Sequence, residues 1–182
     1  MKEKTLWITR TGLLLALLIA LQAITRPLGQ LVTGSCVNAL LALSAGLCGT
    51  ACGLTVALLS PVFAWLLGIA PQILVVPAIM LGNAVFILVL SRSPRSGLQI
   101  RQLAVWLAAA CAKAAVLYSL VKWVLCGCLA PALTAQGLLS QAMQKALPLQ
   151  FSWPQLVTAL IGGGVAMLLV PAVKKAVRKE QV

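Results

Sequence analysis

Long apolar runs alternate with short polar segments along this chain, and the runs have the length of membrane helices. Four of them cover residues 7–25, 71–90, 103–125 and 154–173. At about 1.5 Å per residue, each can cross a hydrocarbon core of about 30 Å. The pattern therefore predicts at least four membrane-spanning helices.

Residues 31–69 form a fifth apolar stretch that is too long for a single span. As one helix it would extend well beyond a core of about 30 Å. Three glycines fall within "GLCGTACG", residues 46–53, and predict a break there. We therefore predict two short helices, 32–47 and 52–68, and six spans in all.

Basic residues support this count. Lys and Arg gather in three clusters at the ends of apolar runs: Lys2, Lys4 and Arg10; Arg92, Arg95 and Arg101; Lys174, Lys175, Arg178 and Lys179. Six spans place all three clusters on one side, which the positive-inside rule assigns to the cytoplasm. The predicted fold is an all-α integral membrane protein, a single six-transmembrane-helix bundle over residues 1–182 with both termini cytoplasmic.

Composition agrees with a membrane location. Of the 182 residues, 62% are hydrophobic and 9% are charged, far too few charges for the surface of a soluble domain. The net charge of +12 comes mainly from the clusters at the helix ends. Such clusters are typical of contacts with anionic lipid headgroups, so we expect no nucleic-acid partner.

The scarcity of acids and imidazoles excludes several kinds of chemistry. Glu3 and Glu180 are the only acidic residues, and the chain has no His. This excludes an intramembrane carboxylate or imidazole proton relay, a His-based metal site and a Ser–His protease. A Ser–Lys dyad using Lys113 has no supporting motif, and no phosphate-binding loop is present. We expect no enzyme activity, no cofactor and no metal.

The 127–153 segment is the longest predicted loop and lies on the outer side. Within it, apolar residues recur at helical spacing between residues 138 and 147, opposite glutamines and a lysine. The pattern predicts an amphipathic helix on the outer surface. Both a lid and a plain interfacial connector fit this pattern.

Polar residues inside the predicted spans are candidate contacts between helices or with a ligand. Asn38 lies two turns into its helix, in "LVTGSCVNALLALSAG", and Asn83 lies near the middle of another span. Each can bond a neighbouring helix or line a ligand site. Lys113 falls near mid-membrane, where its side chain cannot easily reach the surface, whereas Lys122 lies closer to the outer side.

The two lysines lie on opposite faces of their helix at 100° per residue, and Tyr118 shares the Lys122 face. No Asp or Glu lies in any span. Each lysine is therefore neutral, bonded to carbonyl oxygens, or paired with an anionic ligand. We expect Lys122 and Tyr118 to contact the ligand, with Lys113 as the alternative contact. Asn38 is expected to bond within the bundle.

Several phrases of the sequence resemble a known family. "TGSCVNALLALSAG", "GLTVALLSPVFAWLLGIAPQ" and "LGNAVFILV" are similar to segments of the substrate-binding S components of energy-coupling factor (ECF) transporters, and the likeness covers residues 5–173. The resemblance implies a multi-pass subunit of the prokaryotic plasma membrane. It captures a vitamin or similar micronutrient outside and delivers it with a transmembrane coupling subunit and two cytoplasmic ATPases.

The resemblance also assigns expected roles to residues. The small-residue stripe Gly12, Ala16 and Ala20 matches, at its two alanines, the family motif that docks the coupling subunit. Arg26, Gln72, Tyr118, Lys122 and the 127–153 loop fall, by position, in the regions that form the outward-facing pocket. No substrate-specific motif is present, so the substrate stays unnamed.

Two other functions fit the same residues. One is a non-transporting membrane scaffold or assembly factor, held together by glycine and alanine packing. The other is a stand-alone facilitator. A scaffold would tolerate apolar replacements of Asn38, Asn83 and both lysines at a cost in stability only, whereas a facilitator would carry flux without any ATPase.

Overall fold

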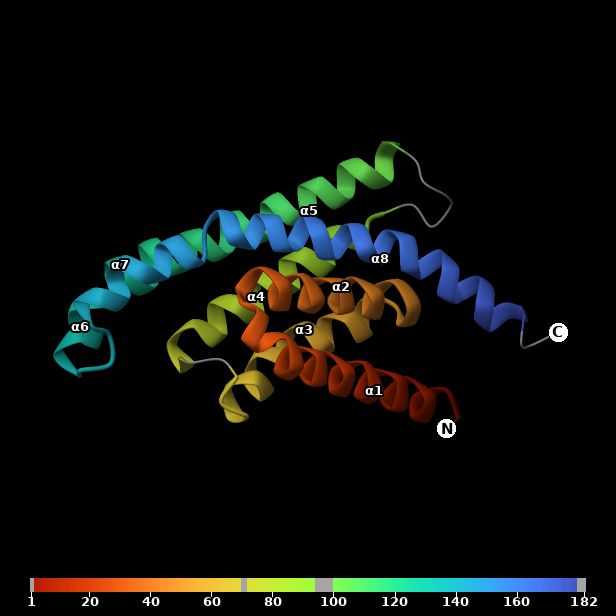
Figure 1. The fold of residues 1–182 in the computed structure, drawn as a ribbon, viewed down its shortest axis with the longest axis horizontal. Coiled ribbons are helices and arrows are strands. Elements are labelled where there is room, and N and C mark those ends of the chain that lie inside the picture. The colour runs from red at the N-terminus through yellow and green to blue at the C-terminus, as the bar shows by residue number, and fades with distance from the viewer. Residues whose placement is uncertain (1, 70–71, 94–99, 180–182) are drawn as a thin grey trace.

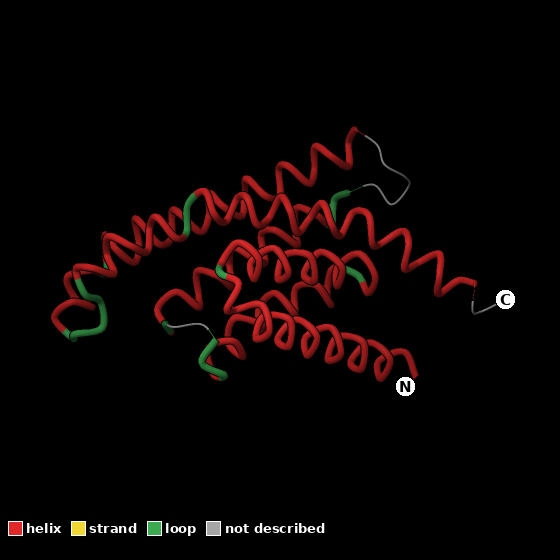
Figure 2. Tube along the Cα trace, in the orientation of Figure 1, coloured by secondary structure: helices red, strands yellow, loops and turns green. Residues whose placement is uncertain are grey.

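The computed structural model describes residues 2–69, 72–93 and 100–179. These residues form helices joined by short connections (Figure 2). No strand occurs in these ranges. The predicted all-α fold is confirmed for the part of the chain that the structure describes.

The first helices follow the predicted runs closely. α1 covers Lys2–Thr25, the short 3₁₀ turn η1 covers Arg26–Leu28, α2 covers Gln30–Cys48 and α3 covers Thr50–Leu66. Only Gly49 separates α2 from α3, with a φ of 91° that favours glycine. Because α2 and α3 pack against each other, the chain reverses direction here. The predicted break between 46 and 53 is confirmed.

The middle of the chain holds two long apolar helices. η2 (Ile73–Val75) leads into α4 (Val76–Leu90), and α5 covers Ile100–Ser119. α5 continues without a break as a π-helical segment, η3, over Leu120–Cys128. A π-helix has more residues per turn than an α-helix, so the periodicity of the sequence could not indicate it.

The predicted 127–153 loop contains two short helices, α6 (Ala130–Ala135) and α7 (Gln141–Gln150). The apolar side of α7 packs against the η3 end of the α5 helix, with Leu139, Leu147 and Phe151 almost fully buried. The predicted amphipathic helix is therefore present. Its place at a membrane surface stays a prediction. α8, over Trp153–Lys179, completes the bundle.

α2 and α8 form the central pair of the bundle. α8 runs along α2, while α1 and α3 pack on α2 and α4 packs between α3 and α5 (Figure 1). Leu41, Val56 and Phe86, from α2, α3 and α4, are fully buried in the core that results. This core holds the helices that supply the polar residues described below.

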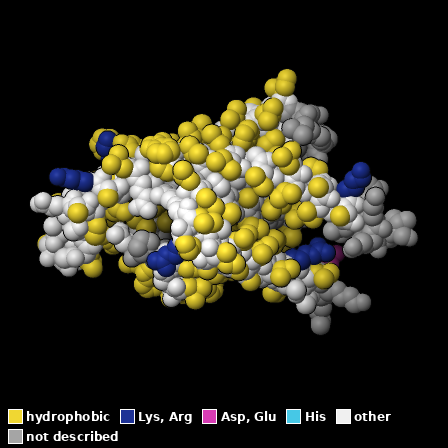
Figure 3. Space-filling model, viewed as in Figure 1, with side chains coloured by type: hydrophobic (Ala, Val, Ile, Leu, Met, Phe, Trp, Pro, Cys, Tyr) yellow, Lys and Arg dark blue, Asp and Glu magenta, His cyan; other side chains and the backbone are white. Residues whose placement is uncertain are grey.

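The surface is that of a membrane protein. Five helical segments are long and apolar enough to cross a bilayer: Glu3–Leu28, Gln30–Cys48, Ile73–Leu90, Ile100–Cys128 and Gln141–Ala176. α3 is apolar but has 17 residues. Hydrophobic side chains cover much of the visible face, and Lys and Arg gather toward its two ends (Figure 3). That α3 makes a sixth crossing stays a prediction.

The start of α1 and the end of α8 lie at the same end of the molecule (Figure 1). α4 ends and α5 begins at that end too. The helices that carry the three basic clusters therefore begin or end toward the same end of the molecule, as an even number of crossings requires. Which side of a membrane this end faces stays a prediction.

Candidate functional site

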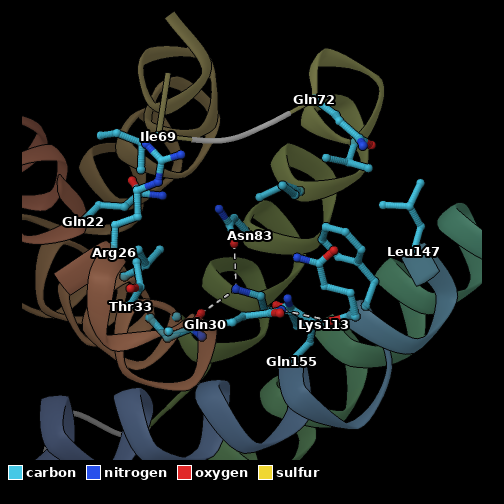
Figure 4. Close-up of a pocket in the computed structure, with 18 residues that line it drawn as sticks. Gln22, Arg26, Gln30, Thr33, Ile69, Gln72, Asn83, Lys113, Leu147 and Gln155 are labelled. Atoms are coloured by element: carbon cyan, nitrogen blue, oxygen red, sulfur yellow. Dashed lines mark hydrogen bonds between the residues drawn. The ribbon is translucent and has the colours of Figure 1, made fainter. Parts of the chain in front are cut away.

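A cavity of about 310 Å³ opens at the other end of the bundle. Its wall comes from the end of α1, the start of α2, the connection from α3 to α4, the first half of α4, the middle of α5, the end of α7 and the start of α8 (Figure 4). Its volume lies at the lower limit of typical small-molecule sites, which is roughly 300 Å³.

Lys113 lies in the cavity wall and is only 2% exposed. Its Nζ donates hydrogen bonds to Oδ1 of Asn38 in α2 and to Oδ1 of Asn83 in α4, the latter at 2.7 Å (Figure 4). The ring centroid of Phe86 lies 5.4 Å from the same nitrogen, close enough for a cation–π contact. One lysine thus connects α2, α4 and α5.

Asn38 extends this cluster to α8. Its Nδ2 donates to Oγ1 of Thr158 at 3.2 Å, and Thr158 donates in turn to the carbonyl oxygen of Gln155 at 3.1 Å. The prediction that Asn38 bonds to a neighbouring helix is confirmed. The polar residues at the start of α2 are also satisfied inside the protein, because Thr33 donates to the Thr25 carbonyl and Ser35 to the Leu31 carbonyl.

Glycine allows α2 and α8 to approach closely enough for these bonds. A Cβ on Gly162 would lie 2.5 Å from the carbonyl oxygen of Ser35 and 2.6 Å from Cβ of Asn38. A Cβ on Gly34 would lie 2.9 Å from Cγ2 of Thr158. Any larger residue at these positions would separate the helices and weaken the contact between Asn38 and Thr158.

Long polar side chains fasten the connections around the mouth of the cavity. Nη1 of Arg26 donates to the carbonyl oxygen of Gly68 at 2.7 Å, which links the α1–α2 turn to the end of α3. Nε2 of Gln30 donates to the carbonyl oxygen of Gln150 at 3.0 Å, which links α2 to the end of α7. The basic side chains of this wall, Lys113 and Arg26, therefore both donate to uncharged oxygen atoms.

Three buried polar atoms of the cavity wall have no hydrogen-bond partner within the described part of the chain. They are Nδ2 of Asn83, Oε1 of Gln22 and Oε1 of Gln72. Buried polar atoms are normally paired, since an unpaired one costs roughly 1–3 kcal/mol. Unpaired donors and acceptors that share one cavity are typical of a site that a ligand completes.

Five of the seven predicted substrate-binding residues lie together in the cavity wall: Arg26, Asn38, Gln72, Asn83 and Lys113. Lys122 and Tyr118 do not line it. They do share a face, because Nζ of Lys122 donates to the Tyr118 hydroxyl at 2.8 Å, but Lys122 is exposed. The expectation that these two residues contact the ligand stays untested, and the structure favours the alternative lysine, Lys113.

Gln22, Gln155 and Thr158 are among the polar residues of the cluster and the cavity wall that sequence reasoning missed. For Thr158 a signal existed, because it precedes Gly162 by four residues and shares its helix face. The two glutamines lie at the ends of apolar runs, where a polar residue is ordinary. Only the folded arrangement distinguishes them.

The predicted docking stripe lies outside the core. Gly12, Ala16 and Ala20 are all exposed on α1, and a Cβ on Gly12 would meet no atom within 4 Å. The stripe is therefore not used for packing between the helices of this chain. It offers a flat surface that another helix can approach closely.

No candidate metal site occurs among the described residues, because no group of three or more His, Cys, Asp and Glu side chains comes together there. The six cysteines are free thiols. The described part of the cavity wall offers hydrogen-bonding groups, the Lys113 amino group and the Arg26 guanidinium.

The chain matches the model of a known protein family. The family model described as "ECF transporter, substrate-specific component" matches residues 7–174, which is most of the chain. No curated protein and no solved structure matched.

Proposed function

This chain belongs to the family of substrate-specific components of ECF transporters, and on that premise we propose that it captures a vitamin-like micronutrient in the cavity around Lys113. As a member of the family it is a membrane protein and a transporter subunit rather than an enzyme. The observation that carries the proposal is the group of unpaired polar atoms beside Lys113, within a cavity of suitable size.

The proposed topology gives this cavity access to the outside. Six crossings, with α3 as the sixth, place both termini and the basic clusters in the cytoplasm of a prokaryotic cell. The cavity lies at the other end, beneath α7 and the connection from α3 to α4. A nutrient could then enter from outside, and α7 could act as its cover.

Delivery to the cytoplasm would require other subunits. The chain has no phosphate-binding loop, and its two acidic residues, Glu3 and Glu180, lie near its ends, so it contains neither an ATPase site nor a carboxylate in the middle of a span for proton coupling. We propose that the exposed stripe of Gly12, Ala16 and Ala20 contacts a transmembrane coupling subunit, which two cytoplasmic ATPases drive. Small residues permit this close helix contact.

Mass spectrometry of small molecules that co-purify with the detergent-solubilised protein tests capture in the cavity. Ile79 lines the cavity, and Ile79→Trp should fill it. Ile161 is 49% exposed on α8, so Ile161→Trp is the matched control. We expect a bound molecule with the wild type and the control, and none with Ile79→Trp.

The opposite results would contradict the proposal. If nothing co-purifies with any of the three proteins and none binds a micronutrient, a scaffold role is favoured. If the Ile79→Trp variant retains the molecule at the wild-type level, the binding site lies elsewhere. Uptake by liposomes without ATPases would instead favour a facilitator.

A further inference from the structure

The unpaired atoms of the cavity define the chemistry of its ligand, an inference that rests on the function proposed above. We propose that the ligand carries a single carboxylate, bound between the ammonium of Lys113 and the amide nitrogen of Asn83. The rest of the ligand is uncharged and donates hydrogen bonds to Gln22 and Gln72.

The sign of the ligand's charge follows from the surroundings of Lys113. Asn38 and Asn83 both turn their amide oxygens, not their nitrogens, toward Nζ, as an ammonium group requires. The only acidic residues, Glu3 and Glu180, lie in the terminal segments. A buried ammonium without a counter-ion is costly, and an anionic ligand would remove that cost.

The number of charges follows from counting the cations in the cavity wall. Lys113 is buried, whereas Arg26, the other cation there, is exposed and already donates to the Gly68 carbonyl. Solvent screens an exposed charge, so only Lys113 can balance a charge at the base of the cavity. One negative charge is therefore matched, and the second charge of a phosphate monoester is not.

The available donors fit the two oxygens of a carboxylate. An ammonium has three N–H groups, and Asn38 and Asn83 accept two of those of Lys113. The Asn83 nitrogen is a second donor in the cavity wall, and it is buried and unpaired within the described chain. A carboxylate beside both groups would accept one bond from each, and charge-assisted bonds of this kind are the strong ones.

The other unpaired atoms set the polarity of the remaining part of the ligand. Oε1 of Gln22 and Oε1 of Gln72 are buried acceptors of the same wall. They pair with hydroxyl or N–H donors. A cavity of about 310 Å³ also restricts the ligand to a small molecule. The site therefore fits a small monocarboxylic acid with hydroxyl, amide or ring N–H groups.

Matched acid and neutral compounds test this inference on the purified full-length protein. The panel contains nicotinate with nicotinamide, pantothenate with panthenol, and biotin with biotin methyl ester, plus pyridoxal phosphate and riboflavin 5′-phosphate as dianions. Thermal unfolding in detergent reports binding, because a ligand of the folded state raises the melting temperature. We expect an acid to bind at least roughly 30-fold more tightly than its neutral partner, which is the lower limit for a buried charged pair.

Asn83→Asp separates ligand binding from folding. The new carboxylate keeps the acceptor for Lys113 and neutralises its charge, and it replaces the free N–H donor with an acceptor. The variant should therefore fold, yet bind the stabilising acid at least roughly 30-fold more weakly. Lys145→Gln, which changes an exposed lysine that does not line the cavity, should bind the acid like the wild type.

Each remaining outcome contradicts the inference. If Asn83→Asp binds the acid as tightly as the wild type, Lys113 only joins helices. If a neutral or dianionic compound binds best, or the co-purified molecule has no carboxylate, the inference fails, while loss of that binding in Ile79→Trp would uphold the proposed function. If no panel compound binds and nothing co-purifies, both fail.

Discussion

Lys113 places its amino group where side-chain hydrogen bonds join the helices of the bundle. Four helices meet there, because Lys113 of α5 bonds Asn38 of α2 and Asn83 of α4, and Asn38 bonds Thr158 of α8. Amide oxygens replace part of the hydration that the ammonium loses. The remaining donors face the cavity, so the same residue can stabilise the bundle and bind a ligand.

Removing Asn38 should therefore affect stability first. Asn38→Ala takes away one acceptor of Lys113 and the partner of Thr158, and bonds to charged groups contribute roughly 1.5–3 kcal/mol. We expect thermal unfolding to show a loss of this size. Ser44→Ala is the matched control, because Ser44 is equally buried in α2 but bonds only to Leu40 of its own helix. Equal losses in both variants would show that the cluster adds no stability.

Three residues of this cluster could be identified from the sequence, but Thr158 and the grouping of the four residues could not. Asn38, Asn83 and Lys113 are conspicuous because polar groups are rare in apolar runs. Whether these side chains come into contact depends on the rotation and spacing of α2, α4, α5 and α8, which no local sequence pattern specifies. Lys122 looked equally suitable by its position, and only the folded protein shows that it donates to Tyr118 on the exposed side of the helix.

At the scale of helices, glycine decides which pairs approach closely. The glycines of α8 have different neighbours, although they are adjacent in sequence. Gly162 faces the backbone of α2, whereas Gly164 faces the ring of Trp106 in α5 at an ordinary 3.4 Å. Length and hydrophobicity therefore position α8 along the chain, and glycine places it against α2.

A single methyl group at each position tests this difference. Gly162→Ala would place Cβ 2.5 Å from a backbone oxygen that cannot move without shifting α2. Overpacking of this kind typically costs about 1–3 kcal/mol. Gly164→Ala should leave thermal stability unchanged or slightly raised, because alanine favours helix by about 0.5–1 kcal/mol. If both variants unfold at the same temperature, close contact between α2 and α8 is not needed.

The outer face of α1 is the second place where helix packing has a functional meaning. Because Ala16 and Ala20 are exposed, Ala16→Leu with Ala20→Leu should leave folding and ligand binding intact and prevent close approach of a coupling subunit. We expect transport to be lost in cells that contain the complete transporter. Ala115→Leu, on an exposed position of α5, is the control. A joint loss of folding and binding would show instead that the stripe packs internally.

At the scale of the whole molecule, the basic residues and the cavity lie at opposite ends. The helix ends that carry the basic clusters lie on one side, and the cavity, which is surrounded by short connections between helices, lies on the other. Helix positions could be predicted because apolar length and a glycine break are local signals. The π-helical end of α5 and the packing of α7 over it could not, since they depend on contacts between distant segments.

Cysteine labelling of whole cells tests how this polarity is oriented in the membrane. After the six native cysteines are replaced, Gln141→Cys at the start of α7 should react with an impermeant maleimide, because the cavity end is proposed to face outside. Gly97→Cys, a sequence position outside the described residues, should react only after the cells are opened, because Arg92 and Arg101 keep the segment between them inside. The reverse labelling pattern would show that the protein has the opposite orientation in the membrane. The cavity would then open to the cytoplasm, and capture from outside would require a different site.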